Sequence, residues 1–143
     1  MIRLTEEMRE LIDNALERGH PAVLATASPD GQPGIGFRGS LMVFDDQHLA
    51  YWERSKKTGL EHIEANPRVA ILIRDHKEKR GWKFFGQAFI YREGPIRDQV
   101  MARVVKRELD RDPHRQGLAV LVRVDRITDM SGNILQIRET PPD

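Results

Sequence analysis

The sequence contains no cysteine, and this absence excludes several kinds of site at once. Without a thiol, the chain forms no disulfide, no zinc–thiolate centre and no thiol nucleophile, a composition that fits a reducing compartment. No apolar run approaches the roughly 18 residues that a membrane span needs, and the first residues contain no apolar signal core. The sequence therefore predicts a cytoplasmic protein that does not enter the membrane.

An excess of charge is also absent, because 23 basic residues face 22 acidic residues. A nearly neutral chain has no long-range field to attract a polyanion, which argues against nucleic acid as the main partner. Trp82, Phe84 and Phe85 lie close together, but aromatic residues in a strand are more often core or interface residues than base-stacking platforms. At 143 residues, the chain has the size of a single domain, 1–143.

Patterns typical of metal or nucleotide sites are missing too. No two histidines have the i, i+4 spacing of a helical metal site, so we expect no metal centre. Residues 34–39 match the pattern G-x-G-x-x-G, but a dinucleotide-binding loop must open a helix, whereas residues 40–44 have the pattern of a strand. Ser40 and Ser55 lie in no recognisable nucleophile motif, which argues against serine hydrolysis.

Two long helices are predicted from apolar periodicity and from residues that favour helix ends. Thr5 is expected to cap a helix within residues 1–19, whose apolar residues recur every three or four positions as far as Gly19. Pro95 is expected to open a second helix, inserted between strands over residues 95–112. Each helix has one apolar stripe, which predicts packing against a sheet.

The strands are predicted from short apolar runs bounded by turn residues. We expect strands at residues 22–27, 32–44, 48–52, 68–74, 81–92, 118–124 and 134–137. Short turns join the first three, which predicts an antiparallel meander. The run 68–74 is apolar on both faces, which predicts burial from two sides, in a barrel wall or at a subunit contact. The predicted fold class is mainly β (α+β), an antiparallel barrel of about six or seven strands with about two or three helices.

The segment 51–67 gives the strongest functional signal. A strand ends at Tyr51 and Trp52, and a short helix is expected to begin at Thr58, which has a capping-box spacing to Glu61. The start of a helix leaves N–H groups unpaired and has partial positive charge, so it favours an anion. Extra donors and cations come from Ser55, Lys56, Lys57 and Thr58. The segment is therefore either a phosphate site or an ordinary capped helix with a solvated basic turn.

The order of these elements resembles the FMN-binding split barrel of the pyridoxamine 5'-phosphate oxidase-like family, over residues 21–91. Ala25-Thr26 followed by Asp30-Gly31-Gln32-Pro33 resembles the first hairpin of the family. Tyr51-Trp52 followed by Ser55-Lys56-Lys57 is similar to its strand end and its Ser-Arg-Lys phosphate turn. Asn66-Pro67-Arg68-Val69 resembles the segment where its helix ends. This resemblance implies an antiparallel split β-barrel.

The resemblance also implies FMN as the cofactor. Arg38 and Lys57 would pair with its phosphate, and the backbone from Gly39 to Leu41 would meet the edge of the isoalloxazine ring. In the family, the loop before a later strand brings a polar side chain toward the flavin, and Arg80-Gly81-Trp82 corresponds to this place. The implied cofactor-binding set is Arg38, Gly39, Ser40, Leu41, Tyr51, Trp52, Ser55, Lys56, Lys57, Thr58, Arg80, Gly81 and Trp82.

Family members are homodimers that share two flavin sites across the interface, so the resemblance assigns residues 82–85 to the partner's site. The implied function is oxidoreduction of a small-molecule substrate, with the redox chemistry supplied by the flavin. Lys56 stands where the oxidase has an arginine, and Gly81 has no side chain where the oxidase has a side-chain amide. No tail with arginine and histidine follows residue 137. These differences argue against pyridoxamine phosphate as substrate. The alternatives are a deazaflavin or haem in the same fold, or a non-catalytic flavin-binding or cofactor-free dimer.

Overall fold

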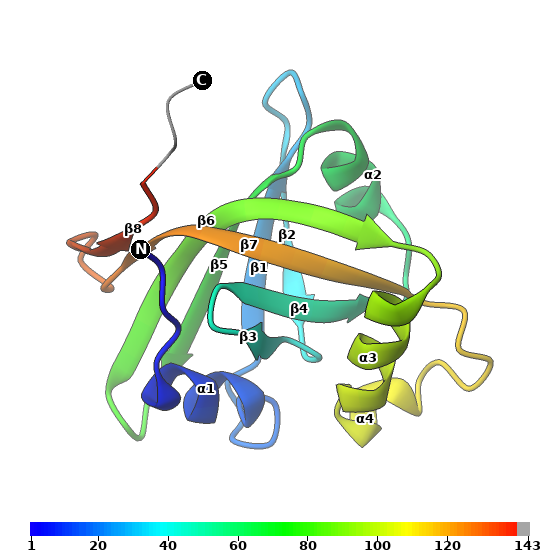
Figure 1. Cartoon of the computed structure of the whole chain (residues 1–143), viewed down its shortest axis with the longest axis horizontal. Helices are drawn as coiled ribbons and strands as arrows, with labels where there is room; N and C mark the ends of the chain where they lie inside the picture. The colour runs from blue at the N-terminus through cyan, green and yellow to red at the C-terminus, as the bar shows by residue number, and fades with distance from the viewer. Residues whose placement is uncertain (140–143) are drawn as a thin grey trace.

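The computed structural model describes residues 1–139, so residues 140–143 of the predicted domain lie outside the described part. Four helices and eight strands make up this part (Figure 1). The strands are β1 (Ala22–Ala27), β2 (Pro33–Arg38), β3 (Met42–Asp45), β4 (His48–Glu53), β5 (Arg68–Asp75), β6 (Arg80–Tyr91), β7 (Leu118–Thr128) and β8 (Ile134–Ile137). The helices are α1 (Glu6–Asp13), α2 (Thr58–Ala65), α3 (Pro95–Arg103) and α4 (Lys106–Leu109).

The strands pair in the order β2-β1-β5-β6-β7-β4-β3, with β8 added to β7. β2 and β3 follow each other in the chain but lie at the two ends of this order, where β2 pairs with β1 and β3 pairs with β4, both antiparallel. The mainly β antiparallel fold predicted from the sequence is therefore confirmed. The predicted single strand 32–44 is wrong, because it divides at residues 39–41. This division replaces the expected three-strand meander and accounts for the additional strand.

Ser40 gives the physical reason for the division. Its buried hydroxyl accepts the N–H of Trp52 at 2.9 Å and lies 3.3 Å from the Trp52 carbonyl oxygen, to which it donates. The hydroxyl thus satisfies Trp52 backbone groups that a continuous neighbouring strand would otherwise pair. The backbone leaves the sheet at this point and re-enters it as β3.

The main core lies inside the barrel, and a second apolar cluster lies outside it. Tyr51, Phe84 and Ile71 are among the fully buried residues of the interior. The second cluster joins β4 and β7 to α3, with Trp52 and Val100 at its centre. Both faces of β4 and β7 are therefore buried, one by the barrel interior and one by the helix.

The strand predicted to be buried on both sides, 68–74, is β5, and within this chain only one of its faces is buried. Val69, Ile71 and Ile73 point into the core, whereas Ala70 and Leu72 on the other face are half-buried. Helix α3 packs against β4 and β7, so it does not cover this face of β5, and burial at a subunit contact stays a prediction. The apolar outer face of β5 is left for another contact.

The first predicted helix, 1–19, is shorter than expected. Thr5 caps it as predicted, because its Oγ1 accepts the Met8 N–H at 3.2 Å. The helix ends at Asp13, whose carboxylate accepts the N–H of Val43 in β3 at 2.8 Å. Residues 14–19 continue as turns. The apolar periodicity extends beyond the helix because the turns also bury Ala15.

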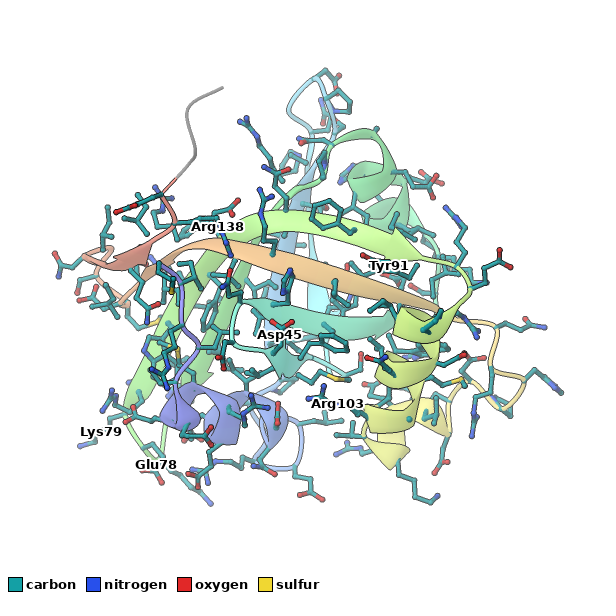
Figure 2. All side chains as sticks on the ribbon, in the orientation of Figure 1. Asp45, Glu78, Lys79, Tyr91, Arg103 and Arg138 are labelled. Atoms are coloured by element: carbon teal, nitrogen blue, oxygen red, sulfur yellow. The ribbon has the colours of Figure 1, made fainter. Side chains whose placement is uncertain are left out.

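The second predicted helix, 95–112, is two helices, α3 and α4. Val104 and Val105 separate them with extended ψ angles of 135° and 136°. Two adjacent β-branched residues disfavour helix, which fits a break at this point. Arg103 also fixes the end of α3, since it reaches β3 and donates to the carbonyl oxygens of Val43 at 2.6 Å and Phe44 at 2.9 Å (Figure 2).

Asp112 joins the segment after α4 to β4. Its Oδ2 accepts the Trp52 indole N–H at 2.8 Å and the Gly117 N–H at 2.8 Å, and Oδ1 accepts the Gln116 N–H at 3.0 Å. Burial raises the pKa of Asp112, but these hydrogen bonds outweigh burial, so its pKa lies below the usual aspartate value. A lowered folded pKa means that this stabilisation is present above the pKa of the unfolded chain and is lost as the pH falls below it.

Replacing this carboxylate should destabilise the fold. We expect Asp112→Ala to lower the free energy of unfolding by about 2–3 kcal/mol, because buried N–H donors lose a charged acceptor. Asp110→Ala is the matched control, since Asp110 forms an exposed i, i+4 pair with Lys106 and should change stability by less than about 0.5 kcal/mol. Urea denaturation followed by circular dichroism measures both. Equal stability losses in the two variants would contradict the role given to Asp112.

Candidate functional site

Arg38, the last residue of β2, lies against the first turn of α2. A β-carbon at position 59 would lie only 2.7 Å from Arg38 Nη2, and one at position 36 would lie 3.1 Å from Nη1. Gly36 in β2 and Gly59 in α2 therefore leave the space that the guanidinium occupies. Gly59 was not among the residues predicted from the sequence. A glycine at the second position of a short helix after a basic turn was its only sequence signal.

The start of α2 differs from the predicted capping box. Lys57 is the N-cap residue and makes no side-chain cap bond, so the prediction that Thr58 caps the helix is wrong. α2 begins at Thr58, as predicted, and Lys56, with a positive φ of 52°, lies directly before the N-cap residue. Ser55, Lys56, Lys57 and Thr58 are all exposed. The basic turn and the first N–H groups of α2 are thus open to a ligand next to Arg38.

A buried carboxylate lies at the centre of this group. Glu53, the last residue of β4, is 3% exposed, and its Oε2 lies 3.2 Å from Arg38 Nη2. Its Oε1 accepts the Ser55 hydroxyl at 3.1 Å. Glu53 was not among the residues predicted from the sequence, although it lies between the predicted residues Trp52 and Ser55. One carboxylate therefore contacts two of the predicted phosphate ligands.

Two polar atoms beside Glu53 have no hydrogen-bond partner among residues 1–139. They are Arg38 Nε and the hydroxyl of Tyr51, and both are buried. The Arg38 guanidinium lies over the Tyr51 ring at 5.5 Å from its centroid. Burial, and then the charge of Glu53, raises the pKa of Tyr51 well above its usual value, so the phenol remains neutral. The charged atoms of this cluster are therefore those of Arg38 and Glu53.

Arg38 separates two cavities. The larger, of about 250 Å³, lies between the 39–41 turn, the end of β4 and α4, and the smaller, of about 180 Å³, lies between β1, β2 and the start of α2. Arg54, Glu108 and Arg111 contribute charged side chains to the larger cavity, and Arg54 Nε lies 3.5 Å from Glu108 Oε2. Glu108 and Arg111 come from a segment that was not predicted to take part in the site, and Arg54 lies within 51–67 but was not among the predicted residues.

The structure gathers part of the predicted set around these cavities. Arg38, Gly39, Ser40, Trp52 and Ser55 line the larger cavity, and Arg38 and Thr58 line the smaller. The side chains of two predicted residues, Leu41 and Tyr51, are core residues instead. Ser40 has its hydroxyl occupied by the Trp52 backbone, so it offers the cavity little beyond its own backbone.

Arg80, Gly81 and Trp82 lie at the other end of the molecule. Figure 1 shows the start of β6 near α1, at the lower left, and α2 at the upper right. Arg80 forms an ion pair with Glu7 of α1, and Trp82 is buried in the main core. Within one chain, these three residues are not brought together with Arg38.

The described residues contain no group of three or more metal-ligating acidic, histidine or cysteine side chains. Within the same part of the chain, no helix is long and apolar enough to cross a membrane.

Comparison with known proteins agrees with this fold. The sequence model of the family "Pyridoxamine 5'-phosphate oxidase" matches residues 4–129. Among curated proteins, no sequence matches the chain. The crystal structure of HupZ from Group A Streptococcus is 28% identical, with a TM-score of 0.73, and the alignment covers 92% of this chain and 98% of that one.

Two further solved structures share the fold at lower identity. An FMN-binding protein from Syntrophomonas wolfei is 13% identical, with a TM-score of 0.66 and coverage of 87% of this chain and 86% of that one. A protein described as F420 Reductase is 22% identical, with a TM-score of 0.58 and coverage of 81% and 94%. The family match over most of the sequence, together with the shared fold, identifies this chain as a member of the pyridoxamine 5'-phosphate oxidase family.

Proposed function

We propose that this protein is a homodimer that binds FMN and acts as a flavin-dependent oxidoreductase on a small-molecule substrate. The observation that carries the proposal is the position of the Arg38 guanidinium against the first turn of α2, beside Ser55, Lys56 and Lys57. A helix start with an adjacent guanidinium is a favourable place for a phosphate group. The unpartnered Nε of Arg38 leaves a buried donor at the same place.

The residues of the site fit both the phosphate and the ring of FMN. Arg38, Ser55, Lys57 and Thr58 would hold the phosphate, because their donors and charges surround the start of α2. The larger cavity extends from there past Gly39 and Ser40, and Phe37, 69% exposed, contributes to its wall. FMN supplies the redox chemistry when bound. The chain supplies charge around the phosphate and an apolar surface for a flat ring.

The homodimer is supported by an apolar surface on the outer face of the sheet. We call it the outer patch, and it consists of Val23, Ala25, Ile35, Phe37, Ala70, Leu72 and Phe85. The strand register makes the outer patch continuous, since Ala25 pairs with both Ile35 and Ala70, and Ala70 pairs with Phe85. An exposed apolar patch of this kind marks an interaction surface.

Phe37 belongs both to the outer patch and to the wall of the larger cavity. A second copy of the chain seated on the outer patch would therefore lie beside the cofactor site. Arg80 and Gly81, which lie away from Arg38 in one chain, are proposed to act in the partner's site. Trp82, whose side chain is buried in the main core, is proposed to do so through its backbone.

A deazaflavin is the second cofactor candidate, and a specific observation favours it. Such a cofactor contains a phosphodiester and an acidic tail, so it needs a wider basic groove than Lys56 and Lys57 provide. Arg54 and Arg111 extend the basic lining of the larger cavity. Haem has less support, because the described residues that line the two cavities include no histidine, cysteine, methionine or tyrosine as an axial ligand.

The phosphate assignment can be tested with Ser55→Ala combined with Lys57→Ala. We expect this variant to bind FMN more weakly by about 1–3 kcal/mol, because it loses one neutral and one charged hydrogen bond to the phosphate. A flavin fluorescence-quench titration measures the change. Riboflavin, which lacks the phosphate, should bind equally well to the variant and the unaltered protein.

Lys77→Ala, in the turn between β5 and β6, is the control for a lost surface cation and should leave FMN affinity unchanged. Undiminished FMN affinity in the double variant would rule out the phosphate site. A purified protein that stays colourless after incubation with FMN and desalting would rule out the cofactor. Reoxidation of the reduced, protein-bound flavin by a candidate acceptor would separate an enzyme from a flavin-carrying protein.

The dimer surface can be tested with a matched pair of substitutions. Ile35 and Ile134 are 82% and 58% exposed, but only Ile35 belongs to the outer patch. We expect Ile35→Glu to convert the dimer to a monomer, since an interface that buries this residue would bury an unpaired charge. Ile134→Glu should remain dimeric. Light scattering after size exclusion measures the mass, and a dimeric Ile35→Glu protein would place the interface elsewhere.

A further inference from the structure

Glu53 occupies two of the donors that the proposed phosphate would use, one at Arg38 Nη2 and one at Ser55 Oγ. Its two oxygens lie 3.2 Å from Arg38 Nη2 and 3.1 Å from Ser55 Oγ. Building on the proposed function, we propose that Glu53 is an internal anion that competes with the ligand's phosphate for Arg38 and Ser55. By this competition, Glu53 makes the site select ligands whose phosphate has a single negative charge.

The hydrogen bonds of Arg38 explain why the competition is direct. A guanidinium has five N–H donors in a fixed fork, which suits a carboxylate and a phosphate equally. Nη1 donates to the Phe37 carbonyl oxygen at 2.8 Å, and Nη2 donates to Glu53. Ser55 has a single hydroxyl proton, and it is donated to Glu53. A phosphate that takes these donors must displace the carboxylate or share them with it.

Because Glu53 is buried, its charge acts strongly on a phosphate nearby. The side chain is 3% exposed, so water screens it little from a phosphate at the start of α2. Its charge offsets that of Arg38, which leaves the exposed Lys56 and Lys57 and the helix start as the remaining positive groups. Repulsion by Glu53 is larger for a dianion than for a monoanion. A phosphodiester, or a phosphate monoester in its singly charged form, is therefore favoured.

The other ionisable groups around Glu53 do not produce the same repulsion of a phosphate. Arg54 is paired with Glu108 at 3.5 Å, and Arg111 lines the larger cavity. Tyr51, under Arg38, is neutral because burial raises its pKa. His62 of α2 has its Nδ1 2.8 Å from Thr26 Oγ1, and every comparison below uses variants that keep it.

The test is Glu53→Gln, which keeps the shape of the side chain and removes its charge. We expect FMN to bind about tenfold or more tightly to this variant, from the loss of one buried like charge. Riboflavin affinity should not change. The gain should be larger at about pH 8 than at about pH 5.5, because a phosphate monoester takes up its second charge with a pKa of about 6. A residue that merely supports the fold would not produce this pH dependence.

Glu108→Gln is the matched control, since it removes a carboxylate from the same cavity that does not contact Arg38. It should give a clearly smaller gain in FMN affinity. Glu53→Gln binding FMN as weakly as or more weakly than the unaltered protein would overturn the proposal. An equal gain at both pH values, or an equal gain for riboflavin, would overturn it as well.

If neither protein binds any flavin, the proposed function fails and inorganic phosphate becomes the probe. The melting temperature of Glu53→Gln should then rise more on addition of phosphate than that of the unaltered protein, and equal shifts would overturn the competition. If Glu53→Gln does not fold, Glu53→Asp takes its place. Its shorter carboxylate reaches Arg38 and Ser55 less well, so FMN or phosphate should bind more tightly, and unchanged or weaker binding would overturn the proposal.

Discussion

The hydroxyl of Ser40, bound to both backbone groups of Trp52, holds the turn at which β2 passes into β3. At this turn the chain leaves one end of the sheet order and joins the other, so the division of the barrel depends on it. The same turn forms one side of the larger cavity. A single buried hydrogen-bonding side chain thus links the topology of the barrel to the location of the site.

The site forms where three segments that are distant in sequence end close together. β2 ends in Arg38, β4 ends in Glu53, and α2 begins with Thr58. Gly36 in β2 and Gly59 in α2 leave space for the guanidinium of Arg38. Glu53, at the end of β4, compensates the charge of this guanidinium. A buried charge needs a partner of this kind, because desolvation of an unpaired ion is costly. Any anionic ligand must therefore enter an arrangement that is already neutralised.

The two faces of the sheet are covered in different ways. On β4 and β7, α3 covers the outer face, and Asp112 secures the segment after α4 through the Trp52 indole. On β1, β2 and β5, no helix among residues 1–139 covers the outer patch, where Ile35 and Phe37 are exposed. An apolar strand face that lacks a helix is the usual setting for contact with another subunit. This difference explains why β5 has a sequence that suits two buried faces but has only one in the single chain.

Local sequence patterns were sufficient for most elements. Alternating and continuous apolar runs predicted the strands, Thr5 predicted the start of α1, and the basic turn before Thr58 predicted where the exposed cations lie. These features depend on residues close together in the chain, so periodicity and turn chemistry reveal them. The predicted family is confirmed for the same reason, since its motifs are short and ordered along the chain.

Most of the features that sequence patterns missed depend on contacts between distant residues. The division at residues 39–41 depends on Trp52, twelve positions after Ser40, and the break at Val104 lies where α3 ends against β3. Glu53 and Gly59 belong to the site because β2 places Arg38 between them. Neither a carboxylate nor a glycine is informative by itself. The packing of β2, β4 and α2 around one guanidinium makes both of them part of the site.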